Sequence, residues 1–159
     1  MKRILLIAIA TFLLASCAVT PPIRDFNQHA TNVYVEPAPG MGVVYFYQES
    51  LIGDVSFPVW DDRKKIGGVS PGTYFFYQAA PGDHIFWSET DVKRFFSLKI
   101  EAGKKYFIYV SWDEGGYGLG FTAARPLFSL APEWMGAEAV KSMKYATLAE
   151  TDRTRDAGR

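Results

Sequence analysis

One histidine in the expected folded part of the chain, with acids near it, is the place where acid–base chemistry could occur. His84 directly follows Asp83, but neighbours on a strand point to opposite faces, so the two side chains do not orient each other. A Ser-His-Asp triad needs a serine on a sharp turn, and the sequence contains no Gly-x-Ser-x-Gly. We therefore expect His84 to begin a strand after a tight turn, with its imidazole bonded to a nearby carbonyl.

The remaining acid–base candidates are expected to be solvated. Asp61-Asp62 and Asp113-Glu114 are adjacent acids that each fall in an expected turn between strands. The second histidine, His29, lies in a polar, proline-containing stretch with no partner nearby. The sequence therefore assigns no catalytic residue, and the chain is predicted not to be an enzyme.

Metal and cofactor chemistry is not predicted either. One cysteine and two histidines are too few for a zinc site built from His and Cys. The run from Asp113 to Gly116 offers too few alternating oxygens for a calcium loop. No glycine-rich phosphate loop opens a helix, so we expect no metal and no cofactor.

The one cysteine, Cys17, lies at the end of an N-terminal export signal. Lys2 and Arg3 form a short positive region, followed by the apolar run Ile4–Leu14. That run has 11 residues, whereas a helix that spans a bilayer needs about 20. Leu14-Ala15-Ser16-Cys17 then resembles the lipobox of bacterial lipoproteins.

The lipobox resemblance implies that residues 1–16 are a signal peptide cut before Cys17 and that Cys17 carries the lipid. Several acyl chains together give stable membrane anchoring. Ala18 stands where an Asp would retain a lipoprotein in the inner membrane, which favours the outer membrane, with the domain facing the periplasm. The alternatives are an ordinary secretory signal with an incidental cysteine, or an uncleaved anchor.

The charge balance excludes a nucleic-acid-binding surface. The chain has 17 Lys and Arg against 17 Asp and Glu, and the basic residues are scattered. Removal of residues 1–16 takes away Lys2 and Arg3 but no acid, which leaves a formal side-chain charge of −2. This net charge gives no overall attraction toward phosphate backbones or anionic lipid.

Composition divides the mature chain into three parts. Residues 17–41 carry the lipidated Cys17 and a proline-rich stretch, which is typical of an extended tether about 80 Å long. Residues 42–146 are expected to form the folded domain. Residues 147–159 are charged and poor in large apolar side chains, so they are predicted to be a disordered tail.

The folded part is predicted to be all-β, an antiparallel β-sandwich of about seven short strands with a C-terminal α-helix. β-Branched and aromatic runs recur about every ten residues with turn residues between them, which is typical of sandwiches and barrels. The expected strands are 43–47, 56–60, 73–78, 84–89, 95–101, 106–112 and 120–130. Residues 74–77 and 106–110 are apolar on both faces and so are expected to be central, while Pro58 and Pro126 indicate edges or bulges. A helix is predicted to start at Pro132-Glu133.

Several short motifs in the expected domain follow one another in the order found in a known lipoprotein family. These motifs are Tyr45-Phe46-Tyr47, Asp61–Gly67, Gly72-Thr73-Tyr74-Phe75, Pro81-Gly82-Asp83-His84 and Ala102–Tyr106. In order and spacing they resemble the bacterial lipoproteins of the domain-of-unknown-function 2846 family over about residues 42–130. Gln48 stands where the family has an Arg, and Asp62 replaces a turn Gly. The family has no assigned activity, so the resemblance implies a fold and a location only.

The aromatic content leaves one candidate binding surface. Trp60, Trp87, Trp112 and Trp134 could form an exposed platform for a glycan or a protein, or they could fill the core. We therefore predict a lipid-anchored envelope protein with a non-catalytic interaction or structural module and an envelope protein as partner. The alternative is a binding protein for a small apolar or glycan ligand in an aromatic pocket.

Overall fold

The computed structural model describes residues 26–29, 32–49, 55–90, 92–117 and 121–148. Cys17, its lipobox, Ala18 and residues 149–159 of the expected tail lie outside them. The strands within these residues are β1 (Phe26–His29), β2 (Gly42–Gln48), β3 (Phe57–Asp61), β4 (Lys64–Val69), β5 (Thr73–Ala79), β6 (Gly82–Glu89), β7 (Lys93–Ile100), β8 (Lys105–Tyr117), β9 (Phe121–Ala131) and β10 (Lys144–Leu148). The helix α2 spans Glu133–Lys141.

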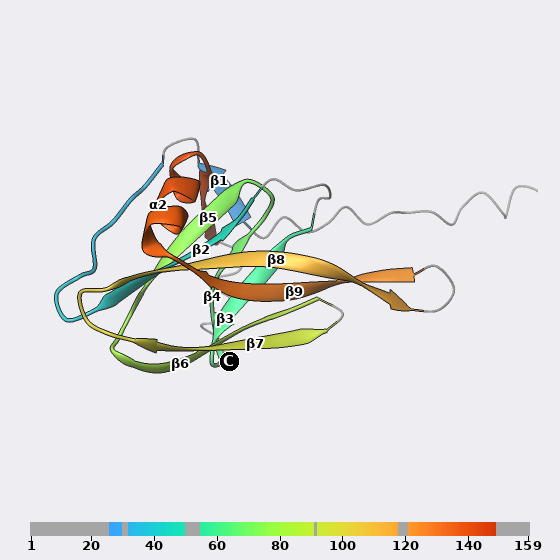
Figure 1. Cartoon of the computed structure of the whole chain (residues 1–159), viewed down its shortest axis with the longest axis horizontal. Coiled ribbons are helices and arrows are strands. Elements are labelled where there is room, and N and C mark those ends of the chain that lie inside the picture. The colour runs from blue at the N-terminus through green and yellow to red at the C-terminus, as the bar shows by residue number, and fades with distance from the viewer. Residues whose placement is uncertain (1–25, 30–31, 50–54, 91, 118–120, 149–159) are drawn as a thin grey trace, which may run out of the picture.

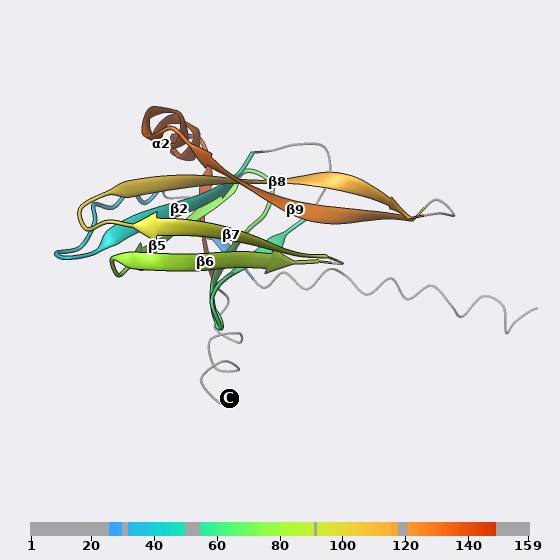
Figure 2. The ribbon, with the colours of Figure 1, turned by 60° about the horizontal axis from the view of Figure 1, so that its bottom comes forward.

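The strands form two sheets, as Figures 1 and 2 show. One has the order β1-β10-β5-β2-β8-β9, and the other has the order β4-β3-β6-β7. Within these sheets β10 is parallel to β5 and β2 is parallel to β8, while the other pairs are antiparallel. The predicted all-β sandwich with a C-terminal helix is confirmed.

All seven predicted strands are present, as β2, β3 and β5 to β9, and the strands β1, β4 and β10 were missed. β4 reads Lys-Lys-Ile-Gly-Gly-Val, which lacks the composition of a strand, and it forms because it pairs with β3. Pro126 lies on the edge strand β9, as expected. Pro58 lies on an inner strand next to a register shift between Val59 and Trp60, which is the expected bulge.

The six-stranded sheet is buried on both faces, so the molecule has three layers, which Figure 2 shows with α2 above and β6 and β7 below. Phe46 on β2 stacks on Phe75 at 4.9 Å and meets Phe86 of the other sheet edge-on at 5.1 Å. On its other face, Tyr45 stacks on Phe107 at 4.9 Å beneath α2. The central positions expected for residues 74–77 and 106–110 are therefore confirmed.

Helix α2 lies so close to β8 that Gly136 is required at the contact. A Cβ added at Gly136 would lie 2.2 Å from the Cβ of Phe107. The glycine that weakens the isolated helix therefore permits the close approach of the helix to the sheet. None of the helices in the described part of the chain is long and apolar enough to cross a membrane.

Much of the expected tether belongs to the folded domain. The Tyr45 hydroxyl accepts from the Val35 amide at 2.7 Å and donates to the Val35 carbonyl at 2.8 Å. The Tyr74 hydroxyl accepts from the Val33 amide at 2.6 Å and donates to Asn32 Oδ1 at 2.8 Å. The hydroxyls of two buried tyrosines therefore fix the backbone of this segment, in place of pairing with a neighbouring strand.

Both expected domain boundaries need correction. The expected tether 17–41 is wrong from residue 26, because β1 pairs with β10 and residues 32–38 are bonded to α2 and to the sheet. The expected boundary between domain and tail at residue 146 is also wrong, because β10 continues to Leu148. These segments carry few large apolar residues, and long-range pairing rather than local composition orders them.

Candidate functional site

Two of the predicted tryptophans meet on the outer face of the four-stranded sheet. Trp60 on β3 and Trp87 on β6 are register partners, and their rings stack at 4.2 Å with their planes 5° apart. Lys65 Nζ of β4 lies 5.9 Å from the Trp60 ring, and Lys93 Nζ of β7 lies 4.0 Å from the Trp87 ring. We call this row, which crosses all four strands, the Lys-Trp-Trp-Lys row.

Two exposed apolar side chains lie beside this row. Phe95 on β7 is the register partner of Trp87 and is 64% exposed. Ile85 on β6 alternates with Trp87 on the same face and is 53% exposed. We call Trp60, Ile85, Trp87 and Phe95 the outer patch. Lys93 pairs with Glu89 at its rim.

The geometry of the outer patch favours contact through ring edges and aliphatic groups. Each indole has one face against the other indole and the second face toward a lysine ammonium. The indole N–H of Trp87 donates to the Asp62 carbonyl at 2.5 Å. A sugar that stacks on tryptophan needs an open ring face, and here a lysine ammonium lies over the outward side of each indole.

The other two tryptophans are elsewhere. Trp112 on β8 is half-buried and packs against the core between the sheets. Trp134 at the start of α2 is 73% exposed. The predicted set of four therefore divides into one stacked pair, one core residue and one helix residue.

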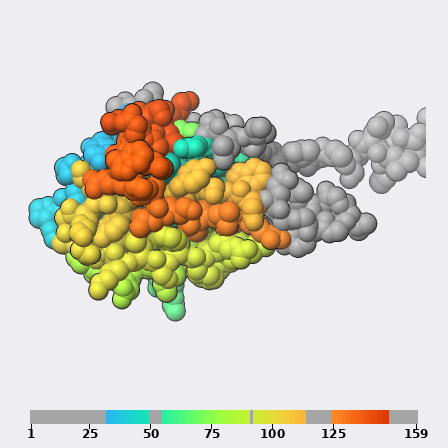
Figure 3. Space-filling model, in the orientation of Figure 1, coloured from blue at the N-terminus to red at the C-terminus, as the bar shows by residue number. Residues whose placement is uncertain are grey.

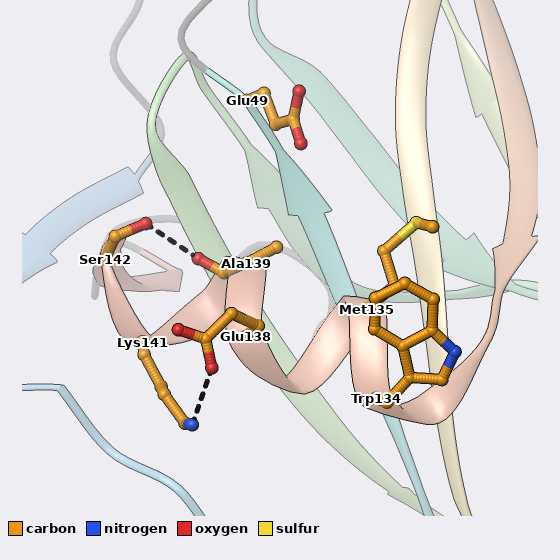
Figure 4. A pocket seen from close by; sticks show the side chains of 7 residues that line it. All are labelled: Glu49, Trp134, Met135, Glu138, Ala139, Lys141 and Ser142. Atoms are coloured by element: carbon orange, nitrogen blue, oxygen red, sulfur yellow. Dashed lines mark hydrogen bonds and ion pairs between the residues drawn. The ribbon is translucent and has the colours of Figure 1, made fainter.

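Trp134 lies beside a shallow groove between α2 and the end of β2, which Figure 4 shows. The groove has a volume of about 480 Å³, and Met135 and Ala139 contribute to its lining. Glu49 faces the helix across it, while Glu138 is paired with Lys141 at 2.7 Å. Burial and the nearby Glu49 carboxylate raise the pKa values of Tyr47 and Tyr109.

The structure gives His84 a partner that sequence reasoning missed. His84 Nδ1 lies 2.8 Å from Asp61 Oδ2, and Nε2 lies 2.9 Å from the Ala80 carbonyl. The expected bond to a nearby carbonyl is confirmed. The expectation that Asp61 is solvated is wrong, because its side chain is only 12% exposed.

Asp61 lies where the two sheets face each other. Asp61 and His84 belong to the four-stranded sheet, whereas Tyr77, whose pKa the Asp61 carboxylate raises, lies on β5 of the other sheet. Burial raises the pKa of Tyr77, and the Asp61 carboxylate raises it further. Both nitrogens of the ring face oxygens of the fold, so this network performs a structural task in the observed arrangement.

The other predicted acids are not gathered into a site. Asp62 and Asp113 are exposed, as expected, and the side chain of Glu114 lies outside the described residues. The turn expected at Asp113-Glu114 is wrong, because both residues lie within β8 and pair with β9. Among the residues that the structure describes, no group of three or more His, Cys, Asp or Glu side chains could hold a metal ion. The side chain of His29 is likewise outside them, although its backbone pairs with Tyr145.

Comparison with known proteins gives one relative. An uncharacterized protein from Haemophilus influenzae (strain ATCC 51907 / DSM 11121 / KW20 / Rd) is 29% identical over 98 residues. Those residues are 60% of this chain and 58% of the relative, so this chain matches less than two thirds of the relative's length. No family model and no solved structure matches the chain. The relative's name assigns no activity.

Proposed function

We propose that this chain is a membrane-anchored envelope lipoprotein whose β-sandwich is a non-catalytic interaction module. The lipid is attached at Cys17 after removal of residues 1–16, and Ala18 directs the protein to the outer membrane. The lipobox Leu14-Ala15-Ser16-Cys17 supports the anchor. The motif order described above supports membership of the domain-of-unknown-function 2846 lipoproteins.

The outer patch is the observation that carries the interaction role. Phe95 and Ile85 expose apolar surface on a sheet face whose neighbouring tryptophans are already held in place by stacking. An apolar centre with a charged rim is the usual anatomy of a protein–protein interface. Lys65, Lys93 and Glu89 supply that rim.

The partner of the outer patch is an envelope protein rather than a small molecule. The patch lies on a sheet surface, and small ligands bind in concave sites that enclose most of their surface. The rigid row beside Phe95 also favours a protein partner, because preorganised side chains lose little entropy on binding.

Site-specific cross-linking in intact cells tests the interaction role. A photo-reactive benzoylphenylalanine replaces Phe95 in one variant and Leu130 in a control, since Leu130 is a similarly exposed apolar residue on β9. We expect position 95 to give one discrete cross-linked envelope protein and position 130 to give none. Equal cross-linking patterns at both positions would contradict the proposal, and Phe95→Ser should abolish co-purification of the cross-linked partner.

A second candidate function is supported by the groove beside α2. Trp134 and Met135 offer apolar surface, and Glu49 offers a carboxylate on the opposite side. These groups fit a small ligand with an apolar part. Peptidoglycan fragments and the apolar dye N-phenylnaphthylamine serve as probes in a thermal-shift assay. A rise in Tm that Trp134→Ala removes would support this second function, and no shift with any probe would exclude these ligands.

A further inference from the structure

The folded domain begins close to the expected lipid, an inference that rests on the proposed function. Only eight residues, 18–25, separate Cys17 from Phe26 at the start of β1. Even a fully extended chain of this length spans only about 30 Å. With the lipid on Cys17, Phe26 therefore stays within about 30 Å of the bilayer, much nearer than a tether reaching to residue 41 would hold it.

The strand pairing shows which end of the domain lies near the lipid. Phe26 is the register partner of Leu148 at the end of β10. β10 runs parallel to β5, with Lys144 beside Thr73 and Tyr145 beside Tyr74, so Leu148 lies toward the end of β5 that carries Tyr77. Lys64 of β4 lies above the Tyr77 ring at 5.6 Å, and β4 contacts both β10 and β1. The anchored end is therefore the end that carries the turn between β3 and β4.

This turn projects from the domain on the side opposite α2, as the space-filling view in Figure 3 shows. Its residues Asp62, Arg63, Lys64 and Lys65 are here called the basic turn. Asp62, Arg63 and Lys64 are exposed, and Lys65 is half-buried. Asp61 does not offset these cations at the surface, because its carboxylate points inward to His84. Three cations therefore stand against one exposed acid.

Local charge rather than net charge decides how this end behaves beside a membrane. The field of an anionic bilayer decays over about 8–10 Å at physiological salt. For binding to the bilayer, the overall charge of −2 therefore matters less than the charges of the end that residues 18–25 keep near the lipid. Each Lys or Arg near an anionic surface strengthens binding by about fivefold, and tethering raises the local concentration further.

We propose that the basic turn binds the anionic headgroups of the bilayer in which Cys17 is anchored. The domain then rests on the membrane with the β3–β4 end down and α2 away from it. Arg63 and Lys64 make the headgroup contacts, because both are exposed at the tip of the turn. Lys65 lies beside them and reports on the contact.

Lysine footprinting of the full lipidated chain tests this orientation. The protein is reconstituted into vesicles of phosphatidylcholine alone or into vesicles that also contain anionic phosphatidylglycerol. It is then acetylated briefly and analysed by mass spectrometry. The same spectra report whether Cys17 carries its lipid. Lys141 and Lys144 are the internal reference. Lys141 is the last residue of α2 and Lys144 is the first residue of β10, so both lie away from Leu148 at the other end of β10.

We expect Lys64 and Lys65 to react about threefold or more slowly in the anionic vesicles and Lys141 and Lys144 to react equally in both. About 0.5 M salt should remove the difference by screening. Arg63→Gln/Lys64→Gln should restore the reactivity of Lys65, and the charge-matched control Lys141→Gln/Lys144→Gln should leave its protection intact.

Equal reactivity of Lys64 and Lys65 in both vesicles, on a chain with lipidated Cys17, would overturn this inference alone. An absent lipid on Cys17 would overturn the proposed function and this inference with it.

Discussion

Trp60 and Trp87 stack 4.2 Å apart on the outer face of the four-stranded sheet, and each carries a lysine ammonium on its other side. The stack connects β3 to β6, and the lysines come from the two outermost strands. The row therefore couples all four strands through side chains on a solvent-exposed face. It is both a stabilising element and the rigid base of the outer patch.

Two substitutions should distinguish the contribution of the tryptophan stack to stability from the contribution of Phe95 to partner binding. Trp87→Ala removes the aromatic pair, the contact with Lys93 and the bond to the Asp62 carbonyl, so we expect a loss of about 2 kcal/mol in the free energy of unfolding. Phe95→Ser, at an exposed position, should change stability by less than about 0.5 kcal/mol while it removes partner binding. Urea unfolding measures both. Equal stability of Trp87→Ala and the wild type would contradict the structural role of the row.

Tyr45 should contribute to stability mainly through its hydroxyl. Tyr45→Phe leaves the amide and carbonyl of Val35 without their partner, at a cost of about 1–3 kcal/mol. Tyr109→Phe is the control, because Tyr109 is half-buried and makes no comparable pair of backbone bonds within the described residues. Urea unfolding of the two variants should show a larger loss for position 45. A loss at position 109 as large as that at position 45 would show that the bonds to Val35 add little.

The buried tyrosines predict loss of stability in alkali. Burial raises the pKa of Tyr45 to about 12, and it also raises the pKa values of Tyr47, Tyr74, Tyr77 and Tyr109. The unfolded chain ionises first, near pH 10, so the folded state binds more protons between about pH 10 and 12 and stability falls with rising pH there. Unfolding followed by far-UV circular dichroism measures this. The fall should be shallower in Tyr45→Phe, and a stability that rises above pH 10 would contradict the sign.

The network around Asp61 predicts a contrast between adjacent acids. Asp61→Asn removes the charged partner of His84 in a half-buried place beside Tyr77, so we expect a loss of about 1–2 kcal/mol. Asp62→Asn is the matched control: Asp62 is exposed with φ of 52°, a conformation that Asn tolerates, so its change should be near zero. Thermal unfolding of the two variants gives the comparison. Equal losses would show that the contact between Asp61 and His84 contributes little.

Local composition was sufficient to predict the strands that are rich in aromatic and β-branched residues, but not those stabilised by distant partners. β2 and β8 have such composition and were predicted. β1 and β10 are instead stabilised by pairing with each other, although most of the chain lies between them in the sequence. Residues 32–38 were predicted as tether because their partners are tyrosine side chains rather than a strand. No periodicity in the sequence records such contacts.

The candidate site was only partly predictable for the same reason. Trp60 and Trp87 could be selected as large aromatics, but their pairing depends on β3 lying beside β6, with β4 and β5 between them in the chain. Asp61 and His84 are 23 residues apart and meet through the same pairing. The composition of the turn after Trp60 indicated only that Asp61 was near the surface, because acids in turns are usually solvated.

Membrane fractionation of cells that produce the wild type or Cys17→Ala tests the anchoring claim most directly. We expect the wild type in the membrane pellet, with a mass that shows acyl chains on Cys17, because several chains hold a protein stably in a bilayer. The Cys17→Ala variant, whose folded domain from Phe26 to Leu148 is unchanged, should be released into the soluble fraction. A Cys17→Ala protein that sediments with membranes as completely as the wild type would contradict the account.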